Sequence, residues 1–312
     1  MGRMLPLAAA LLTVVLWASA FVGIRSAGRS LSPGSLSLGR LLVGIVALAV
    51  LCIVHRERPP SREDLRAVGL LVVVTGLLWF GAYNLFLNSG ERRVDAGTAS
   101  MLVNVAPILI AVLAGLFLAE GFPPMLFAGC AVAFGGVALI ALASSDHAAT
   151  TAGVLLCLGA AAVYAPAAIA QKVVLRRLTA LQAVFLCCAV GVVFFLPWIG
   201  QFAHEAARAP AGAIGWLVYL GIFPTAVGFV TWAYALSRTD AGRLGIMTYL
   251  VPPISILLGW IWLGESPAAL AYVGGALCLA GVALSRVKAF TRRAPICAST
   301  REPVDDTPMM LE

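Results

Sequence analysis

Charge is scarce in this chain of 312 residues. Charged residues make up 11% of it, whereas a soluble domain carries about 25%. Hydrophobic residues make up 61%, and the mean hydropathy is +0.98. A soluble core could not bury this much apolar surface, so the composition excludes a soluble domain and predicts a polytopic membrane protein. The net charge of +7 therefore bears on membrane orientation rather than on nucleic-acid binding.

The apolar segments also lack acid–base and metal chemistry. No Asp, Glu, His or Lys falls in the central part of any of them, and the seven cysteines form no C-x-x-C pair. Metal or acid–base catalysis needs convergent clusters of such residues, so we expect no catalytic residue, no metal and no cofactor. The same absence favours facilitated transport, or coupling near the helix ends, and a neutral or zwitterionic substrate.

Ten segments are apolar and long enough to cross the bilayer as helices, which takes about 20 residues each. The fold class predicted is therefore all-α and polytopic, with short connections between the spans. The ten segments are 5–24, 36–54, 67–88, 96–118, 125–143, 152–171, 179–199, 214–236, 243–263 and 267–285.

The first segment also has the outline of a secretory signal peptide. Arg3 precedes an apolar run, and Ala18-Ser19-Ala20 resembles a cleavage site. Cleavage there would leave the first half of the chain one span short of the second. We therefore interpret this segment as the first membrane span, with small residues for close helix packing.

Lys and Arg are distributed unevenly between the two sides of the predicted bundle. With the N-terminus inside, fifteen lie on the cytoplasmic side and six on the outer side. This bias predicts a multi-pass protein of the cytoplasmic membrane with both termini in the cytoplasm. The polar tail over 286–312 is expected to be a disordered cytoplasmic segment.

The chain contains an internal repeat. A shift of 145 residues aligns polar landmarks as well as apolar ones, and the front parts of the repeats align less sharply at a shift of 147. The predicted organisation is a first repeat at 1–143, a linker at 144–151 and a second repeat at 152–285. At the shift of 145, Asp95-Ala96-Gly97 falls on Asp240-Ala241-Gly242, Pro107 on Pro252, Glu120 on Glu265, and Gly136-Val137-Ala138-Leu139 on Gly281-Val282-Ala283-Leu284.

Each repeat holds five spans, and an odd number gives the two repeats opposite orientations in the membrane. Inverted repeats are typical of secondary carriers, in which the substrate site lies near mid-bilayer between the repeats. The repeat therefore predicts a transporter.

Several motifs resemble one transporter family. They are LWASAFVGIR in the first span, Pro33 followed by Arg40 at the start of the second, and DAGTASMLVNVAPILIAVLAGLFLAE across the fourth, which the ninth repeats as DAGRLGIMTYLVPPISILLGWIWLGE. Together they resemble the paired EamA domains of the drug/metabolite transporter superfamily, over residues 5–285.

The resemblance implies a ten-helix carrier that exports amino acids, other metabolites or drug-like compounds. It also implies a central cavity lined by spans one, three, four, six, eight and nine. Alternatives are a flippase or multidrug exporter of the same superfamily and, least favoured, a membrane-embedded enzyme. The partners expected are a small-molecule substrate and the lipid bilayer, with no nucleic acid; a homodimer stays open.

Polar and aromatic residues at depth are candidates for the cavity wall, because an amide in hydrocarbon needs partners. Asn104 aligns with Tyr249, three residues before a proline in each repeat. The predicted substrate-binding residues are Trp17, Asn84, Asn104, Tyr164, Trp232 and Tyr249. Further candidates at depth are Ser19, Trp79, Tyr83, Asn88, Gln171, Thr225 and Thr248.

Five further residues are candidates for gating or ion pairing. Arg40 either extends toward the headgroups or pairs with a carboxylate such as Glu265 or with an anionic substrate group. Glu120 and Glu265 either favour the start of the next helix or form a gating ion pair. Pro107 and Pro252 are expected to kink spans four and nine, as moving gate elements or as fixed curvature.

Overall fold

The computed structural model describes residues 4–117, 125–143, 148–238, 244, 247–265 and 267–285. Every regular element within these residues is a helix, as the composition predicts. In the first repeat the elements are α1 (Met4–Ala27), α2 (Pro33–Val54), α3 (Arg62–Thr75), the π-helix η1 (Gly76–Ala82), α4 (Tyr83–Gly90), α5 (Ala96–Val103), α6 (Ala106–Phe117) and α7 (Leu126–Ala143).

The described residues of the second repeat are also helical, with additional short helices after its second span. Its elements are α8 (Ala148–Val174), α9 (Ala180–Phe195), the 3-10 helix η2 (Leu196–Trp198), α10 (Ile199–Ala206), α11 (Ala211–Leu220), the π-helix η3 (Gly221–Val227), α12 (Gly228–Arg238), the 3-10 helix η4 (Thr248–Leu250), α14 (Val251–Leu263) and α15 (Ala269–Ser285).

Six helical segments among the described residues are long and apolar enough to cross a membrane: Met4–Ala27, Pro33–Val54, Arg62–Gly90, Thr151–Val174, Ala180–Ala206 and Ala211–Arg238. Shorter apolar helices cover 96–110, 248–263 and 269–281. The seventh predicted span continues past its expected end at 199, through η2 and α10 to Ala206.

Side-chain caps fix where several helices begin. Ser32 accepts a hydrogen bond from the Ser35 N–H ahead of α2, and Asp95 accepts one from the Thr98 N–H ahead of α5. Thr179 and Gln182 form a capping box at the start of α9. Each cap satisfies backbone N–H groups that have no partner in the first turn.

The repeat of the sequence is also a repeat of irregular structure. The π-helix η1 begins at Gly76 and η3 begins at Gly221, and both extend over seven residues, so they are 145 residues apart. A π-helix is uncommon and occurs frequently at functional sites. Its recurrence at the register of the sequence repeat shows that both halves share one local fold.

The pairing of α7 with α15 shows how the two repeats are related. A Cβ added at Gly136 of α7 would meet the Gly274 carbonyl oxygen, and one added at Gly281 of α15 would meet the Gly129 oxygen. Each contact is the other shifted by 145 residues. Residue numbers rise along one helix as they fall along the other, so the equivalent helices are antiparallel and the repeats are inverted.

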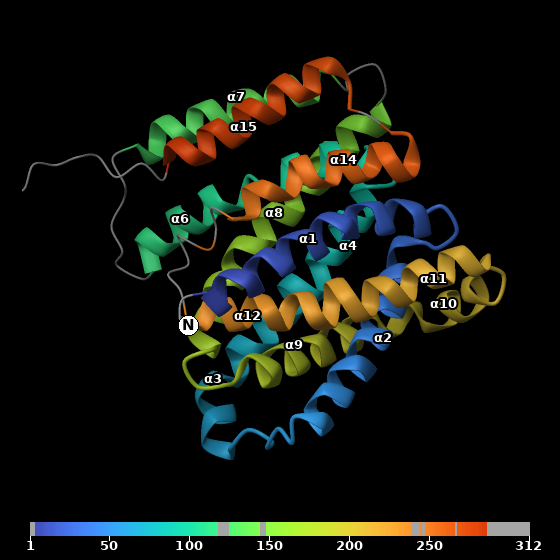
Figure 1. Cartoon of the computed structure of the whole chain (residues 1–312), viewed down its shortest axis with the longest axis vertical. Coiled ribbons are helices and arrows are strands. Elements are labelled where there is room, and N and C mark those ends of the chain that lie inside the picture. The colour runs from blue at the N-terminus through green and yellow to red at the C-terminus, as the bar shows by residue number, and fades with distance from the viewer. Residues whose placement is uncertain are drawn as a thin grey trace, which may run out of the picture.

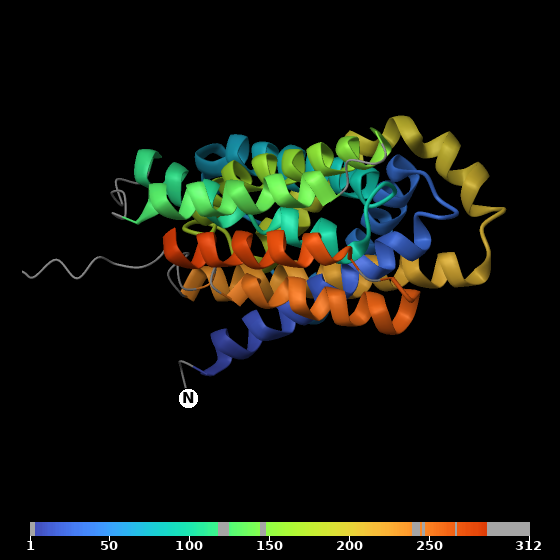
Figure 2. The same ribbon diagram turned by 90° about the horizontal axis from the view of Figure 1, so that it is seen from above.

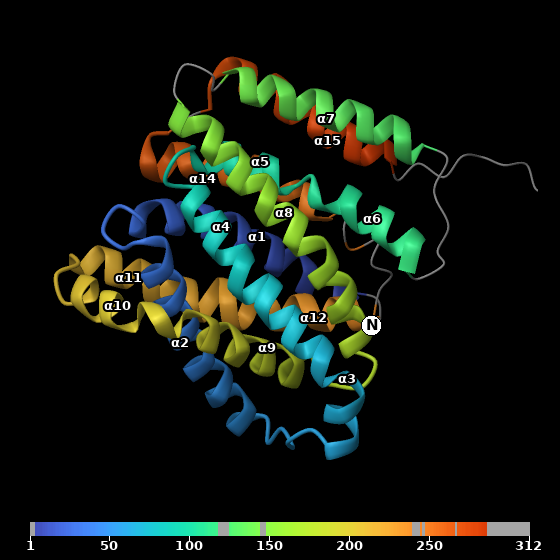
Figure 3. The same ribbon diagram turned by 180° about the vertical axis from the view of Figure 1, so that it is seen from behind.

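The helices form a bundle whose long axes run largely in one direction (Figure 2). Helix α1 contacts both α12 and α14 and lies between them in the middle of the bundle (Figure 1). On the opposite face α4 lies beside α8 (Figure 3). The core between these helices therefore receives side chains from both repeats.

Candidate functional site

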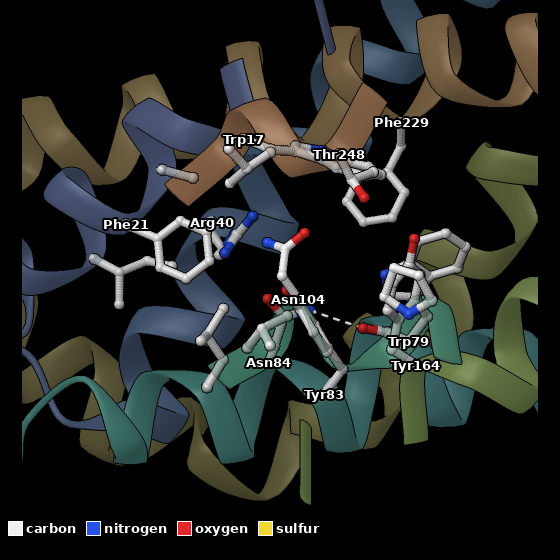
Figure 4. Close-up of a pocket in the computed structure, with 16 residues that line it drawn as sticks. Trp17, Phe21, Arg40, Trp79, Tyr83, Asn84, Asn104, Tyr164, Phe229 and Thr248 are labelled. Atoms are coloured by element: carbon white, nitrogen blue, oxygen red, sulfur yellow. Dashed lines mark hydrogen bonds between the residues drawn. The ribbon is translucent and has the colours of Figure 1, made fainter. Parts of the chain in front are cut away.

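A cavity opens between the two repeats, in the middle of the bundle. It contains about 660 Å³ of empty space including its mouth, and the centre of a water-sized sphere can occupy about 60 Å³ of this space. Amide, aromatic and small side chains surround it together with one arginine (Figure 4). The lining residues are Trp17, Ala20, Phe21, Ile24, Arg40, Trp79, Tyr83, Asn84, Leu87, Val103, Asn104, Pro107, Tyr164, Phe229, Thr248 and Val251.

Helix periodicity explains the contribution of α1. Trp17, Ala20, Phe21 and Ile24 are spaced by three and four residues, so they share one face of the helix. Ala18, one residue along from Trp17, is fully buried and points elsewhere. The stretch that resembles a cleavage site is thus a continuous helix with one face on the cavity.

The π-helix η1 determines how Asn84 is held. A π-helix has i→i+5 hydrogen bonds in place of the α-helical pattern, which shifts the backbone register. The Asn84 Nδ2 donates to two backbone oxygens of this element, the Trp79 oxygen at 3.1 Å and the Phe80 oxygen at 2.9 Å. The Asn84 Oδ1 has no hydrogen-bond partner among the described residues, and it lies at the cavity.

Asn104 sits at a break in the fourth span. Helix α5 ends at Val103, and α6 begins at Ala106 with Pro107 in its first turn. The predicted kink is thus a break just ahead of Pro107. A proline is tolerated in the first turn of a helix because backbone N–H groups there have no intrahelical partner, so its missing N–H costs nothing. The Asn104 Nδ2 donates to the Ser100 oxygen at 3.0 Å, and its Oδ1 has no partner among the described residues.

The ninth span is irregular at the equivalent point, where a 3-10 helix passes directly into an α-helix. The 3-10 helix η4 ends at Leu250, and Pro252 lies in the first turn of α14. Thr248 lines the cavity, whereas Tyr249 packs beside Ile108 and Ala133 and does not line it. Asn104 and Tyr249 are therefore equivalent in the sequence repeat but have different surroundings, and only Asn104 lines the cavity.

Aromatic rings form one wall. The centroid of the Trp79 ring lies 4.6 Å from that of Tyr164 and 5.2 Å from that of Phe229. The ring centroid of Trp17 lies 4.9 Å from that of Trp232. Trp232 is not among the residues that line the cavity. Four of the six predicted substrate-binding residues, Trp17, Asn84, Asn104 and Tyr164, thus line this cavity.

Two aromatic lining residues had no signal in the sequence taken one residue at a time. Phe21 and Phe229 are ordinary apolar residues of apolar helices. Phe229 is nonetheless the counterpart of Asn84 at the repeat shift of 145. Applying the repeat to the asparagine would have indicated it.

Arg40 is buried, with 5% of its surface exposed, and lines the cavity. Its Nε and Nη2 donate to the Thr225 Oγ1 at 3.2 and 3.0 Å. No carboxylate oxygen of a described residue lies within 4 Å of its guanidinium. The hypothesis that it pairs with Glu265 is therefore wrong, and so is the alternative that it extends to the headgroups.

Glu265 pairs instead with the two arginines at the end of α1. The Arg25 Nε lies 3.1 Å and the Arg29 Nη2 3.4 Å from the Glu265 Oε1. The Arg25 Nη1 donates to the Glu91 backbone oxygen at 2.6 Å. This cluster ties α1 to the α14–α15 connection and to the end of α4. Glu120, its counterpart in the first repeat, lies outside the described residues.

Glu91 follows α4 and is 1% exposed. Neither of its carboxylate oxygens has a hydrogen-bond partner among the described residues. Burial raises the pKa of this carboxyl well above its ordinary value, and the nearby Arg25 and Arg40 charges oppose that shift only in part. A titratable acid thus lies beside the ion-pair cluster.

The architecture defines a multi-pass helical membrane protein with two inverted repeats around a central cavity. Residues 4–142 and 151–287 each match the EamA-like transporter family. The chain belongs to this family and is a membrane transporter of the drug/metabolite transporter superfamily rather than an enzyme.

Curated relatives match over most of the chain. A probable terminal-alkyne amino-acid exporter from Streptantibioticus cattleyicolor is 41% identical over 91% of this chain and 94% of its own. The uncharacterized transporter YdfC from Bacillus subtilis is 33% identical over 89% of each. A solved crystal structure aligns with a TM-score of 0.64 at 20% identity, covering 89% of this chain and 97% of its own, which shows a shared fold.

Proposed function

We propose that this transporter exports small amino-acid-like metabolites, neutral or zwitterionic, across the cytoplasmic membrane. Alternating access would come from movement of one repeat against the other around the cavity. The observation that carries the proposal is the cavity itself, because Asn84 and Asn104 from one repeat and Tyr164 and Phe229 from the other surround it.

The size of the cavity favours a small solute over a lipid or a bulky drug. The centre of a water-sized sphere can occupy about 60 Å³ of the cavity. One water needs roughly 10–15 Å³ by this measure, so the cavity holds several waters. That volume suits a metabolite of amino-acid size. A lipid-linked substrate would need a wide opening toward the bilayer.

The relative from Streptantibioticus cattleyicolor supports the class of solute. Its name says that it is a probable exporter of a terminal-alkyne amino acid, a zwitterion with a slender apolar side chain. The aromatic wall of Trp79, Tyr164 and Phe229 offers an apolar surface for such a side chain. The polar groups of the two asparagines are available for its charged end.

The distribution of positive charge supports the orientation. With both termini in the cytoplasm, the Arg25–Glu265 cluster lies at the outer end of the bundle and the arginine-rich connection 55–61 lies inside. The uncharacterized inner membrane transporter YhbE of Escherichia coli, 25% identical over 89% of this chain, supports the cytoplasmic membrane as the location.

Transport into vesicles tests the proposal. The purified chain is reconstituted, and uptake of labelled propargylglycine, a terminal-alkyne amino acid, is followed beside a panel of amino acids and amines. We expect uptake of at least one amino acid, and Asn104→Ala should lower the rate roughly tenfold through loss of one hydrogen bond to the solute.

Ser237→Ala is the matched control, because this exposed hydroxyl bonds only to its own helix among the described residues. It should transport as the wild type does. Uptake of no amino acid by the wild type, or undiminished uptake by Asn104→Ala, would contradict the proposal.

A further inference from the structure

We propose that Arg40 binds the carboxylate of the transported solute, so that the substrate class is a zwitterionic α-amino acid with an apolar side chain. The proposal rests on the proposed function and assigns one residue to one end of the solute. Arg40 is the only cationic side chain among the residues that line the described cavity.

The guanidinium of Arg40 has donors to spare. Arginine carries five N–H groups in a planar fork that matches a carboxylate. Within the described residues, its hydrogen bonds run from Nε and Nη2 to the single oxygen Thr225 Oγ1. That bond fixes the side chain in place and leaves the remaining N–H groups for a ligand.

The inverted repeat shows that packing does not require an arginine here. At Gly221 of η3, an added Cβ would meet Val43 Cβ and the Arg40 backbone oxygen. At Gly76 of η1, it would meet Val190 Cβ and the Cys187 backbone oxygen. Both pairs are offset by 147 residues, so Cys187 occupies in the second repeat the place that Arg40 occupies in the first.

Cys187 makes the same close helix contact with a small side chain. The close backbone approach depends on the glycine, so a small side chain suffices for it; in the first repeat the guanidinium adds hydrogen bonds to Thr225 of η3. A buried cation is costly, so its presence in one repeat alone points to an asymmetric task. Binding an anionic group in the cavity is such a task.

The carboxyl groups nearby do not supply the counter-charge. Glu265 pairs with Arg25 at 3.1 Å, and no Glu91 carboxylate oxygen lies within 4 Å of the Arg40 side-chain nitrogens. Tyr83, which also lines the cavity, carries a neutral hydroxyl. The positive charge of Arg40 therefore faces a cavity in which no described residue neutralises it directly.

The opposite end of the solute has acceptors in the same cavity. The Oδ1 atoms of Asn84 and Asn104 are buried and have no partner among the described residues. Both Nδ2 groups bond to backbone oxygens, which orients each amide with its oxygen free. Figure 4 shows Arg40 and Asn104 extending into one space. Carbonyl oxygens accept from an ammonium group as Arg40 donates to a carboxylate.

A comparison of amino acids with their decarboxylated amines tests the proposal. Binding to the purified full-length chain is measured by calorimetry for three pairs: propargylglycine and but-3-yn-1-amine, norvaline and butylamine, and phenylalanine and phenethylamine. We expect the amino acid of at least one pair to bind roughly tenfold tighter than its amine, as a charge-assisted pair predicts.

Arg40→Gln should remove this preference, and Arg40→Lys should restore part of it because the charge remains without the fork. Arg92→Gln, which removes an exposed arginine, should keep the wild-type preference. Size-exclusion chromatography identifies variants that do not fold. Binding of amine and amino acid within about twofold of each other by the wild type, or binding of neither, would overturn the role of Arg40.

Vesicle transport of the same pairs separates this role from the proposed function. If amines and amino acids are carried equally by the wild type and by Arg40→Gln, the chain is a carrier and the role of Arg40 is wrong. If none of the six compounds is carried, the proposed function itself is wrong for this class of solute. Carriage of the amino acid alone, lost in Arg40→Gln, supports both.

Discussion

The Asn84 Nδ2 donates to two backbone oxygens of η1, and the asparagine lines the cavity. Asn104 does the same at the end of α5 with one backbone oxygen. A buried polar atom without a partner costs free energy of about 1–3 kcal/mol. Two such atoms in one cavity are explained when a ligand supplies the missing donors.

The buried carboxyl of Glu91 makes the stability of the chain depend on pH. Its pKa in the folded chain lies above the ordinary value of 4.5, so the folded chain retains a proton that the unfolded chain releases as pH rises. The stability that this group provides is present at low pH and is lost as pH rises through the folded-state pKa. Glu91→Gln should therefore raise the Tm in detergent at about pH 8 and have little effect at about pH 4.

The matched variant is Glu265→Gln, whose carboxylate pairs with Arg25 and Arg29. It should lower the Tm near neutral pH, opposite to Glu91→Gln. Equal gains for Glu91→Gln at both pH values would contradict burial as the cause of the shift.

Among the elements around the cavity, four spans are irregular at mid-length, whereas α1, α2 and α8 are continuous helices. Helices α4 and α12 each follow a π-helix, α6 follows a break ahead of Pro107, and α14 follows the 3-10 helix η4 ahead of Pro252. Irregular backbone at membrane depth is tolerated where it is buried in protein or lines a cavity. The interruptions therefore mark the cavity, and they occur in register in both repeats.

Gly221 tests the packing of one such element. A Cβ there would lie 2.5 Å from Val43 Cβ and 2.7 Å from the Arg40 oxygen. Gly221→Ala should lower the free energy of unfolding by about 1–3 kcal/mol, since a backbone contact cannot yield without moving α2. Thermal unfolding in detergent measures it.

Gly215, six residues earlier in α11, has no atom within 4 Å of an added Cβ. Gly215→Ala should stabilise the chain by up to about 1 kcal/mol, because alanine favours the helix over glycine. If the two variants changed the Tm by the same amount, the close helix contact at Gly221 would not be the cause of the destabilisation.

At the scale of the whole molecule, the two repeats meet through contacts that are copies of one another. The α7–α15 contact has Gly136 against Gly274 and Gly281 against Gly129. Small residues at these points let the helix backbones approach closely, which drives association where the hydrophobic effect is absent. A site between inverted repeats can then be exposed on either side by rocking one against the other.

The inverted symmetry predicts equal effects on stability for substitutions at equivalent positions. Gly136→Ala and Gly281→Ala create the same clash at opposite ends of one contact, so each should lower the Tm by a similar amount, from a loss of about 1–3 kcal/mol. Gly135→Ala is the control, because an added Cβ there meets nothing within 4 Å. Loss at one site alone would show that the two contacts are not equivalent.

Composition, span lengths and the 145-residue repeat were enough to determine a ten-span fold with inverted halves, because hydrocarbon admits only helices whose backbone groups are satisfied internally. Four of the cavity residues, Trp17, Asn84, Asn104 and Tyr164, were also predicted from the sequence, because polar groups inside the membrane need hydrogen-bond partners.

The partner of each buried polar group depends on how the helices pack, which the sequence did not reveal. The sequence offered Glu265 as a partner for Arg40, and the fold gave that carboxylate to Arg25 and brought Thr225 to Arg40. It placed Thr248 rather than Tyr249 on the cavity. Hydropathy indicates the depth of a residue but not its rotation about the helix axis, and the π-helices change this rotation along their spans.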